Sequence, residues 1–138
     1  MLTEADGGPL AVALAPASRH DSLVLQDILE AVVVEPPDPS EHEQHLCLDK
    51  AFDGAPSDAT ARVFGYVPHV RRIGQEKKGR RGRKTKKARR WVVERTISWL
   101  NRCRAILIRW DKNAENYLGM IQLACALLWY RRLHRLTT

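Results

Sequence analysis

Two carboxylates in this 138-residue chain stand where a carboxylate can hold a metal ion or move a proton. Asp49 ends an apolar stretch, residues 45–49, which predicts a buried strand, and the carboxyl ends of strands are where α/β sheets place their ligands. Glu94 falls on one face of a predicted helix, because residues 87, 90, 94, 98 and 101 share a face at 3.6 residues per turn. The other members of that face are Lys87, Arg90, Ser98 and Asn101.

Each of these acids, taken alone, also has an ordinary explanation. An Asp after a strand often caps a helix or lies in a loop. A Glu on a solvated helix face can pair with a cation four residues earlier, which here is Arg90. For either residue considered singly, this ordinary explanation is favoured.

Turn signals and hydrophobic periodicity predict the elements that position the two acids. Asp6-Gly7-Gly8-Pro9 predicts a turn, and residues 10–15 predict the second strand of a hairpin whose first strand is mostly absent. Asp111 or Asn113 can cap the last helix. The order of elements is that of an α/β protein. Helices are predicted over about 22–34, 54–63, 88–108 and 113–135, and further strands over 45–49 and 66–70.

Charge is divided unevenly along the chain. Residues 1–70 carry a net charge of −9 and residues 71–138 a net charge of +16. Residues 71–90 contain twelve Lys and Arg with three glycines, which predicts a basic loop. Clustered cations release the counterions of nucleic acid, so nucleic acid is the expected partner, and an anionic membrane surface is the competing one.

The cysteines and histidines favour no separate metal site. Cys47, Cys103 and Cys125 are odd in number and widely spaced, and their apolar neighbours predict buried free thiols in the cytoplasm. None of the five histidines is spaced like a metal-binding pair, so His42 and His45 are expected to be structural or solvent-exposed. The apolar run 118–130 is too short for a membrane span and predicts a core helix, so no membrane partner is expected.

Together, the two acids lie in motifs that resemble a known family. Residues 46–53, Leu-Cys-Leu-Asp-Lys-Ala-Phe-Asp, resemble the second-Asp motif of insertion-sequence transposases. Residues 90–102, Arg-Trp-Val-Val-Glu-Arg-Thr-Ile-Ser-Trp-Leu-Asn-Arg, are similar to their glutamate motif, in which an Arg precedes the Glu by four. The likeness is to DDE transposases of the bacterial insertion-sequence family five. Further agreement lies at residues 8–12, 17–21, 65–69 and 114–118.

This resemblance implies a fold and a metal-dependent chemistry. The fold would be a partial RNase H-like α/β fold, with a mixed sheet missing its first strand or strands, helices around it and two C-terminal helices. In the family three carboxylates hold two divalent metals, Mg²⁺ or Mn²⁺, which activate the attacking oxygen and stabilise the leaving one. Asp49 and Glu94 would be the second and third ligands. The first Asp is expected upstream of the hairpin, because Asp6 lies in a predicted turn.

The resemblance also implies which residues contact DNA. Residues 1–138 would form one truncated catalytic domain, with the basic loop at 71–87 inside it. Two positions depart from the family pattern, because Lys87 stands where many relatives have Tyr and Asn101 where many have Lys. The expected DNA-binding residues are Arg71, Arg72, Lys77, Lys78, Arg80, Arg81, Arg83, Lys84, Lys86, Lys87, Arg90, Asn101 and Arg102.

The function predicted from these features is DNA cleavage and strand transfer by the transposase of an insertion sequence. Because the first acid is absent from these residues, we expect the chain alone to be inactive. The expected partners are DNA at the element ends and target, and a second copy of the chain or a polypeptide encoded upstream. Two alternatives stay open: a non-catalytic DNA-binding remnant or regulator of the element, and an unrelated basic RNA- or ribosome-binding protein.

Overall fold

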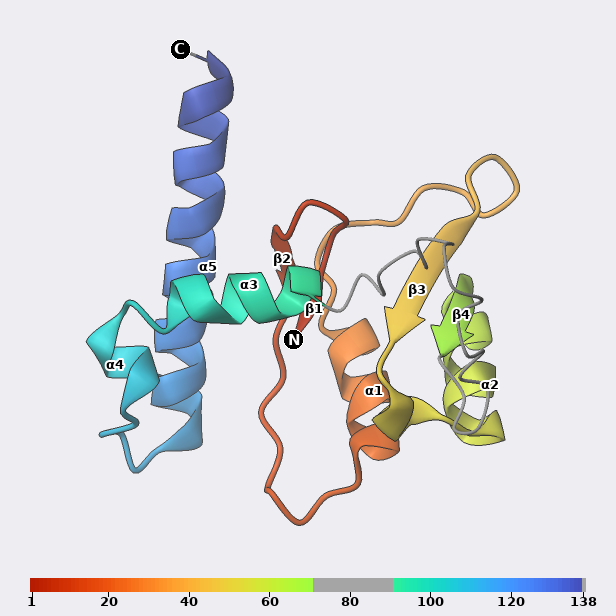
Figure 1. The fold of residues 1–138 in the computed structure, drawn as a ribbon, viewed down its shortest axis with the longest axis horizontal. Helices are drawn as coiled ribbons and strands as arrows, with labels where there is room; N and C mark the ends of the chain where they lie inside the picture. The colour runs from red at the N-terminus through yellow and green to blue at the C-terminus, as the bar shows by residue number, and fades with distance from the viewer. Residues whose placement is uncertain (71–90, 138) are drawn as a thin grey trace, which may run out of the picture.

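The computed structural model describes residues 1–70 and 91–137, which form a mixed α/β fold (Figure 1). Within them lie two small sheets of two strands each, with helices packed around both. This confirms the α/β class. The elements are β1 (Leu2–Thr3), β2 (Pro9–Ala11), α1 (Asp21–Glu30), β3 (Gln44–Leu48), the 3-10 helix η1 (Lys50–Phe52), α2 (Ala55–Val63), β4 (Tyr66–Val70), α3 (Trp91–Leu100), α4 (Arg104–Leu107) and α5 (Ala114–Thr137).

The first sheet is the predicted hairpin, with β1 antiparallel to β2. The N–H of Gly7 donates to the carbonyl of Glu4 at 3.0 Å, and the N–H of Glu4 donates to the carbonyl of Gly8 at 2.9 Å. Gly7 has a φ of 88°, a conformation that only glycine adopts without strain. The turn signal in the sequence therefore places the turn correctly, although β2 is shorter than predicted.

The second sheet pairs β3 with β4 in parallel, with α2 as the crossover between them. Its core comes from α1, β3 and α2, through Leu25, Leu29, Leu46 and Ala61, all buried. Leu25, Ile28 and Leu29 form the face of α1 that is buried, and α1 ends at Glu30, four residues before the predicted boundary. The strands at 45–49 and 66–70 and the helix at 54–63 are confirmed to within one residue.

The predicted helix at 88–108 is wrong as one continuous element. In the described part, α3 ends at Leu100, and a turn leads to the separate short helix α4. The break lets Ile106 enter a core with Leu100, Ile121 and Ala124, and Tyr117 donates its hydroxyl to the Ile106 carbonyl at 2.8 Å. Ile97 of α3 and Leu107 of α4 are exposed.

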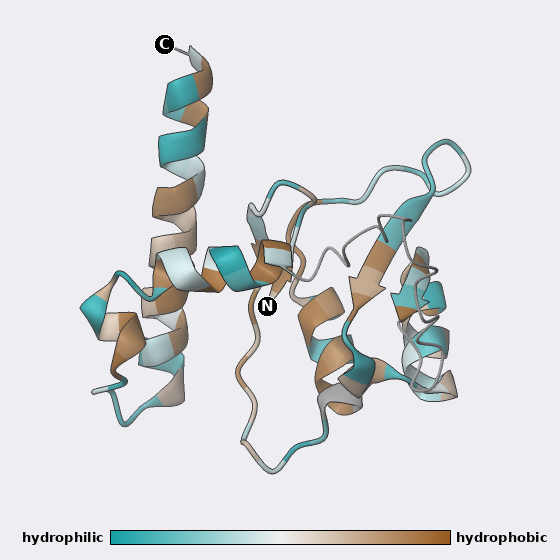
Figure 2. Ribbon diagram, viewed as in Figure 1, coloured by the Kyte–Doolittle hydropathy of each residue, from teal (hydrophilic) through white to brown (hydrophobic). Residues whose placement is uncertain are grey.

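Helix α5 confirms the last predicted element. The Asn113 side chain accepts the N–H of Glu115 at 2.9 Å, so Asn113 caps it as one of the two predicted candidates. Ile121, Ala124, Cys125, Leu128 and Trp129 of α5 are buried or half-buried, whereas Leu123 and Leu136 are exposed. Figure 2 shows hydrophobic residues alternating with hydrophilic ones along α5. Among the described helices, none is both long enough and apolar enough to cross a bilayer.

Side chains of α3 and α5 form hydrogen bonds with backbone carbonyls of the hairpin, and one of them also forms an ion pair with Glu4. Thr96 donates its hydroxyl to the Gly7 carbonyl at 2.7 Å, and Arg95 donates to the Asp6 carbonyl at 2.7 Å. From α5, the Trp129 indole N–H donates to the Pro9 carbonyl at 2.7 Å. Arg132 forms an ion pair with Glu4 at 2.6 Å. We refer to these contacts of Arg95, Thr96, Trp129 and Arg132 as the turn clamp.

The close fit of the turn clamp predicts that Gly8→Ala destabilises the fold. A Cβ at Gly8 would lie 2.6 Å from Trp129 Cη2, and the indole cannot retreat without losing its bond to Pro9. We expect a loss of about 1–3 kcal/mol in the free energy of unfolding, the usual cost of overpacking, measured by urea denaturation. The control is Gly119→Ala, on an open face of α5, which should gain up to about 1 kcal/mol from helix propensity. Equal stability of Gly8→Ala and the parent chain would contradict this packing.

Candidate functional site

Asp49 lies directly after β3 and caps the 3-10 helix η1. Its Oδ1 accepts the N–H of Lys50 at 2.7 Å. The side chain is exposed, while Leu46 of the same strand is buried. The residue therefore occupies the predicted position at the carboxyl end of a strand, and it also performs the capping role of the ordinary explanation.

Glu94 lies in the first turn of α3 and faces solvent. Ser98 and Asn101 are exposed as well, whereas Val92, Thr96 and Leu100 on the other side are buried. The predicted polar face is thus confirmed for the described residues. A negative charge in a helix's first turn also favours the helix through its dipole. Lys87 and Arg90, the other members of the face, lie outside the described residues.

Asp49 and Glu94 belong to parts of the fold that are packed separately. Strand β3 pairs with β4, and α3 packs against β1 and α5. Within residues 1–70 and 91–137, no three His, Cys, Asp or Glu side chains form a group that could hold a metal. Carboxylate oxygens are the donors that Mg²⁺ prefers, so the two acids suit the ion in chemical type. Two carboxylates alone are fewer than the three that the resemblance implies for a metal site.

Most of the predicted DNA-binding residues lie outside the described part of the chain. Asn101 and Arg102 are described, and both are exposed in the turn that follows α3. The residues that cannot be placed are Arg71, Arg72, Lys77, Lys78, Arg80, Arg81, Arg83, Lys84, Lys86, Lys87 and Arg90.

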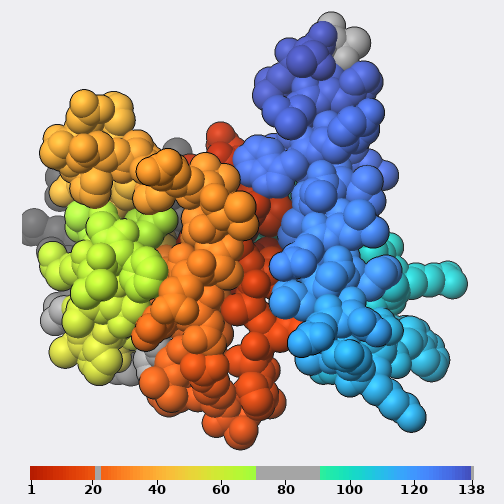
Figure 3. All heavy atoms as spheres, turned by 180° about the vertical axis from the view of Figure 1, so that it is seen from behind, coloured from red at the N-terminus to blue at the C-terminus, as the bar shows by residue number. Residues whose placement is uncertain are grey.

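A groove of about 780 Å³ lies between α3, α5 and the hairpin turn. Five arginines line it, against a single acid, Asp6. Its apolar lining includes Leu100 and Leu128, both of which belong to or pack against the second core. Figure 3 shows α5 alongside the hairpin. Trp129 of α5 therefore contacts Pro9, although the two residues are 120 positions apart in the sequence. The arginines are Arg95, Arg102, Arg131, Arg132 and Arg135; we call this feature the arginine groove.

Arg95 is held by two aromatic rings as well as by the turn. Its guanidinium carbon lies 4.6 Å from the centroid of Trp91 and 5.0 Å from that of Trp99. Such cation–π contacts orient a guanidinium while leaving its charge in place. Its Nε is buried and has no hydrogen-bond partner in the described part of the chain. The groove therefore holds a rigid cation at the point where α3 meets the hairpin.

The arginines of α5 were missed by reasoning from the sequence. Residues 131, 132 and 135 follow an apolar run, and that run was interpreted only as a core helix. Their spacing of one and then three residues places them near one another on a helix, which was the available signal. Nothing in the sequence shows that the turn at residues 6–9 would bring α3 and α5 together around them.

A histidine pair was also missed, because its members are 24 residues apart. His45 Nδ1 and His69 Nε2 lie 2.9 Å apart across β3 and β4, and Glu43 Oε2 lies 3.5 Å from His45 Nε2. Parallel pairing of the two strands creates this proximity. The histidines are exposed, as predicted for His45.

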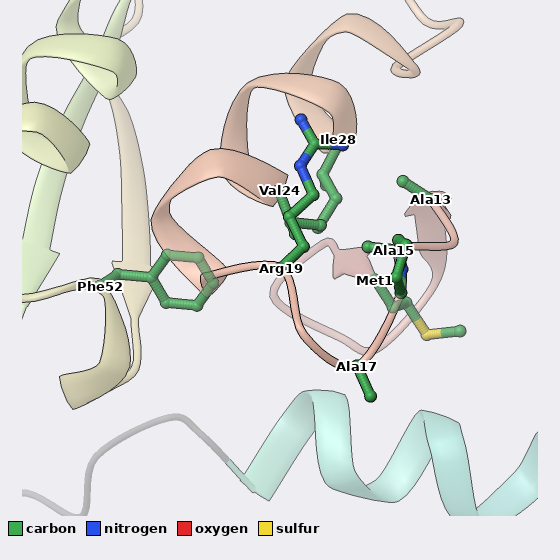
Figure 4. A pocket seen from close by; sticks show the side chains of 9 residues that line it. Met1, Ala13, Ala15, Ala17, Arg19, Val24, Ile28 and Phe52 are labelled. Atoms are coloured by element: carbon green, nitrogen blue, oxygen red, sulfur yellow. The ribbon is translucent and has the colours of Figure 1, made fainter.

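A smaller pocket of about 360 Å³ lies beside α1, and apolar residues together with Arg19 line it. Phe52, Val24 and Ile28 face it, together with alanines of the segment that precedes α1 (Figure 4). Its charged lining residue, Arg19, is paired with Asp27 at 2.5 Å. Among the described residues that line this pocket, none carries a carboxylate.

Comparison with known proteins decides which family this arrangement represents. The model of the family described as transposase DDE domain matches residues 1–129. The chain belongs to this family. A curated protein of Burkholderia cepacia, which carries the name of a transposase for insertion sequence element IS402, is 28% identical over 141 residues. The match covers 98% of this chain and 63% of that relative, so the chain spans less than two thirds of the relative's length. No solved structure matches.

The cysteines of this transposase-family chain differ from the prediction. All three are free, but Cys47 and Cys103 are exposed and only Cys125 is partly buried. Cys47 lies on the outward-facing side of β3, and Cys103 lies in the turn that splits the predicted helix. Apolar neighbours did not predict the burial of these two thiols. Successive residues of β3 face opposite sides of the sheet, and the helix predicted around Cys103 is broken there.

We therefore expect Cys47 and Cys103 to react with a maleimide faster than Cys125 does. Burial raises the pKa of the Cys125 thiol, which leaves less of the reactive thiolate at a given pH, and it also restricts access. Mass spectrometry of tryptic peptides after timed alkylation near pH 8 gives the three rates separately. The difference should disappear in urea, and equal rates in the native chain would contradict the described packing of Cys125.

Proposed function

We propose that the chain is the catalytic part of an insertion-sequence transposase, which cuts DNA at the element ends and joins them to a target. Asp49 and Glu94 would be two of its three metal-binding carboxylates. The observation that carries this proposal is the position of the two acids: one at the carboxyl end of β3, the other on the exposed face of α3. Both lie within the residues matched by the family.

Local structure prepares Asp49 for a role as a ligand. The hydrogen bond from Lys50 N–H fixes the orientation of its carboxylate, as partners outside the metal shell do for metal ligands. On α3, the buried residues Val92, Thr96 and Leu100 set the rotation of the helix and thereby keep Glu94 on the outer face. A divalent cation held there would neutralise charge on the scissile phosphate and activate the attacking oxygen.

The third carboxylate would come from a strand outside these residues, completing an RNase H-like sheet. Two observations support this. First, Asp6 cannot take the role from its present place, because it lies in the hairpin turn and its carbonyl is bound by Arg95 and Arg132. Second, the two sheets have two strands each, a size that is marginal alone, so a strand that joined β1–β2 to β3–β4 would stabilise both.

The decisive experiment is a strand-transfer assay on DNA carrying the element ends, with Mg²⁺ or Mn²⁺. We expect no product from the 138-residue chain alone and product when the polypeptide encoded upstream is supplied. In the complemented reaction, Asp49→Asn and Glu94→Gln should each lower the rate by at least about 100-fold, since even groups that only orient metal ligands cost 10–100-fold. The Asn at 49 keeps an oxygen that can accept the Lys50 N–H, so the cap is retained.

Two controls separate loss of a ligand from loss of charge. Glu115→Gln removes an exposed acid from the first turn of α5, which matches the helical setting of Glu94. Asp53→Asn removes an exposed acid from the other end of η1. Both variants should keep near-parental rates. Full activity of Asp49→Asn would sink the assignment of the acids, and product from the chain alone would sink the need for a third carboxylate from outside these residues.

DNA affinity should depend strongly on salt. The basic half of the chain carries a net charge of +16, and each neutralised phosphate contributes about 0.9 to the slope of log K against log salt. Filter binding of a duplex between about 50 and 200 mM salt should therefore show a steep loss of affinity. Affinity that stays flat over this range would contradict DNA as the partner.

The second candidate function is a DNA-binding regulator that occupies the element ends without cutting them. The arginine groove favours it, since this surface needs no metal. The two candidates separate in the complemented assay. A regulator binds the ends and gives no product even when the upstream polypeptide is present.

A further inference from the structure

We propose that the arginine groove binds the phosphodiester backbone of DNA, as a second contact surface that is separate from residues 71–90 and from the two acids. The inference rests on the proposal that this chain acts on DNA. It adds a site formed by three segments of the chain, residues 6–9, 95–103 and 124–135.

Three of the five arginines in the groove have no neutralising partner in the described part of the chain, while Arg132 is paired with Glu4. Among the residues described, the side chains of Arg102, Arg131 and Arg135 make neither an ion pair nor a hydrogen bond. Guanidinium groups that share a groove repel one another, and the repulsion is relieved when an anion enters. The groove is therefore built to receive negative charge.

The other two arginines give the groove its rigidity. Arg95 and Arg132 both donate to the carbonyl of Asp6, at 2.7 and 3.1 Å. Arg132 also stacks on Trp129, with 5.4 Å from its guanidinium carbon to the ring centroid. Because these two are already ordered, a ligand loses less side-chain entropy on binding there than it would on a free surface.

The lining favours a sugar–phosphate chain over a lipid surface. Guanidinium groups present donors in a planar fork that matches phosphate oxygens. Here they edge a concave groove with an apolar lining that includes Leu100 and Leu128. A helix that lies on a membrane instead presents its cations on one face and its apolar residues to the lipid. Convergence of α3, α5 and the turn around one hollow fits a backbone that is laid into it.

The first test compares two triple variants with equal loss of charge. The groove variant is Arg102→Gln, Arg131→Gln and Arg135→Gln. The control is Arg62→Gln, Arg104→Gln and Lys112→Gln, at three exposed cations outside the groove. Duplex binding is measured by fluorescence anisotropy in EDTA. The groove variant should lose about 2.7 from the slope of log K against log salt, and at least about tenfold in affinity near 0.1 M salt, while the control stays near the parent.

The outcomes separate this proposal from the catalytic one. Equal affinity of the groove and control variants would overturn it, and so would tight binding to phosphatidylserine vesicles without binding to duplex. Asp49→Asn should bind duplex as the parent does, because the assay contains no metal. Failure of strand transfer would therefore leave the groove proposal standing, and failure of the groove variant to lose affinity would leave the catalytic proposal standing.

The second test uses native cysteines as reporters. Cys103 lines the groove and is exposed, whereas Cys47 is exposed on β3. Saturating duplex should slow alkylation of Cys103 severalfold in the parent chain, and should protect it much less in the groove variant. Cys47 provides the reference rate within the same molecule. An unchanged Cys103 rate with DNA bound would overturn the assignment of the groove.

Discussion

The contacts between the turn clamp and the hairpin backbone hold the two halves of this fold together. The clamp uses the carbonyls of Asp6, Gly7 and Pro9. Leu2 of the hairpin packs on the core of α1, β3 and α2, while Val12 packs on the core of α4 and α5. The hairpin is therefore the joint between two cores, and the clamp fixes α3 and α5 to it. Glycine at position 8 is needed because a Cβ there would collide with Trp129.

This joint controls where the two acids can lie. Asp49 follows β3 in the first core, and Glu94 is carried by α3, which packs on the hairpin and α5. The distance between Asp49 and Glu94 therefore depends on the hydrogen bonds of the turn clamp, in which neither acid takes part. A metal site needs ligands positioned to within a fraction of an ångström. For the proposed metal site, a substitution in the clamp would therefore weaken catalysis from a distance, through the angle of α3, while both carboxylates remain intact. Thr96 is the residue whose substitution would act on this angle most directly, because its buried hydroxyl is hydrogen-bonded to the carbonyls of Gly7 in the turn and Val92 in α3.

Local signals in the sequence predicted most of the elements, and with them the position of Asp49 after a strand and of Glu94 on an exposed helix face. They failed where long-range packing decides. The turn at Gly7, the strand ending at Asp49 and the cap at Asn113 depend on neighbours in sequence, and they were predicted correctly. The break after Leu100 was not, because Ile106 is drawn into a core formed with Ile121, fifteen residues later. The exposure of Cys47 was missed for a related reason: β3 buries one face only. Whether Asp49 and Glu94 act together depends on residues that their motifs do not contain.

The arginine groove brings together five positive charges that lie at separate positions in the sequence. Two of its five guanidiniums, Arg95 and Arg132, hold the turn. Arg132 is neutralised by its ion pair with Glu4, whereas Arg95 is bound only to a neutral carbonyl and to aromatic faces, which leave its charge in place. Placing Arg102, Arg131 and Arg135 beside them raises the electrostatic cost of the folded state. That arrangement stabilises nothing by itself, since apolar residues at the same three positions would remove the repulsion. An anion that binds only the folded chain would offset this cost by mass action, so DNA should raise the unfolding temperature of the chain as well as occupy the groove.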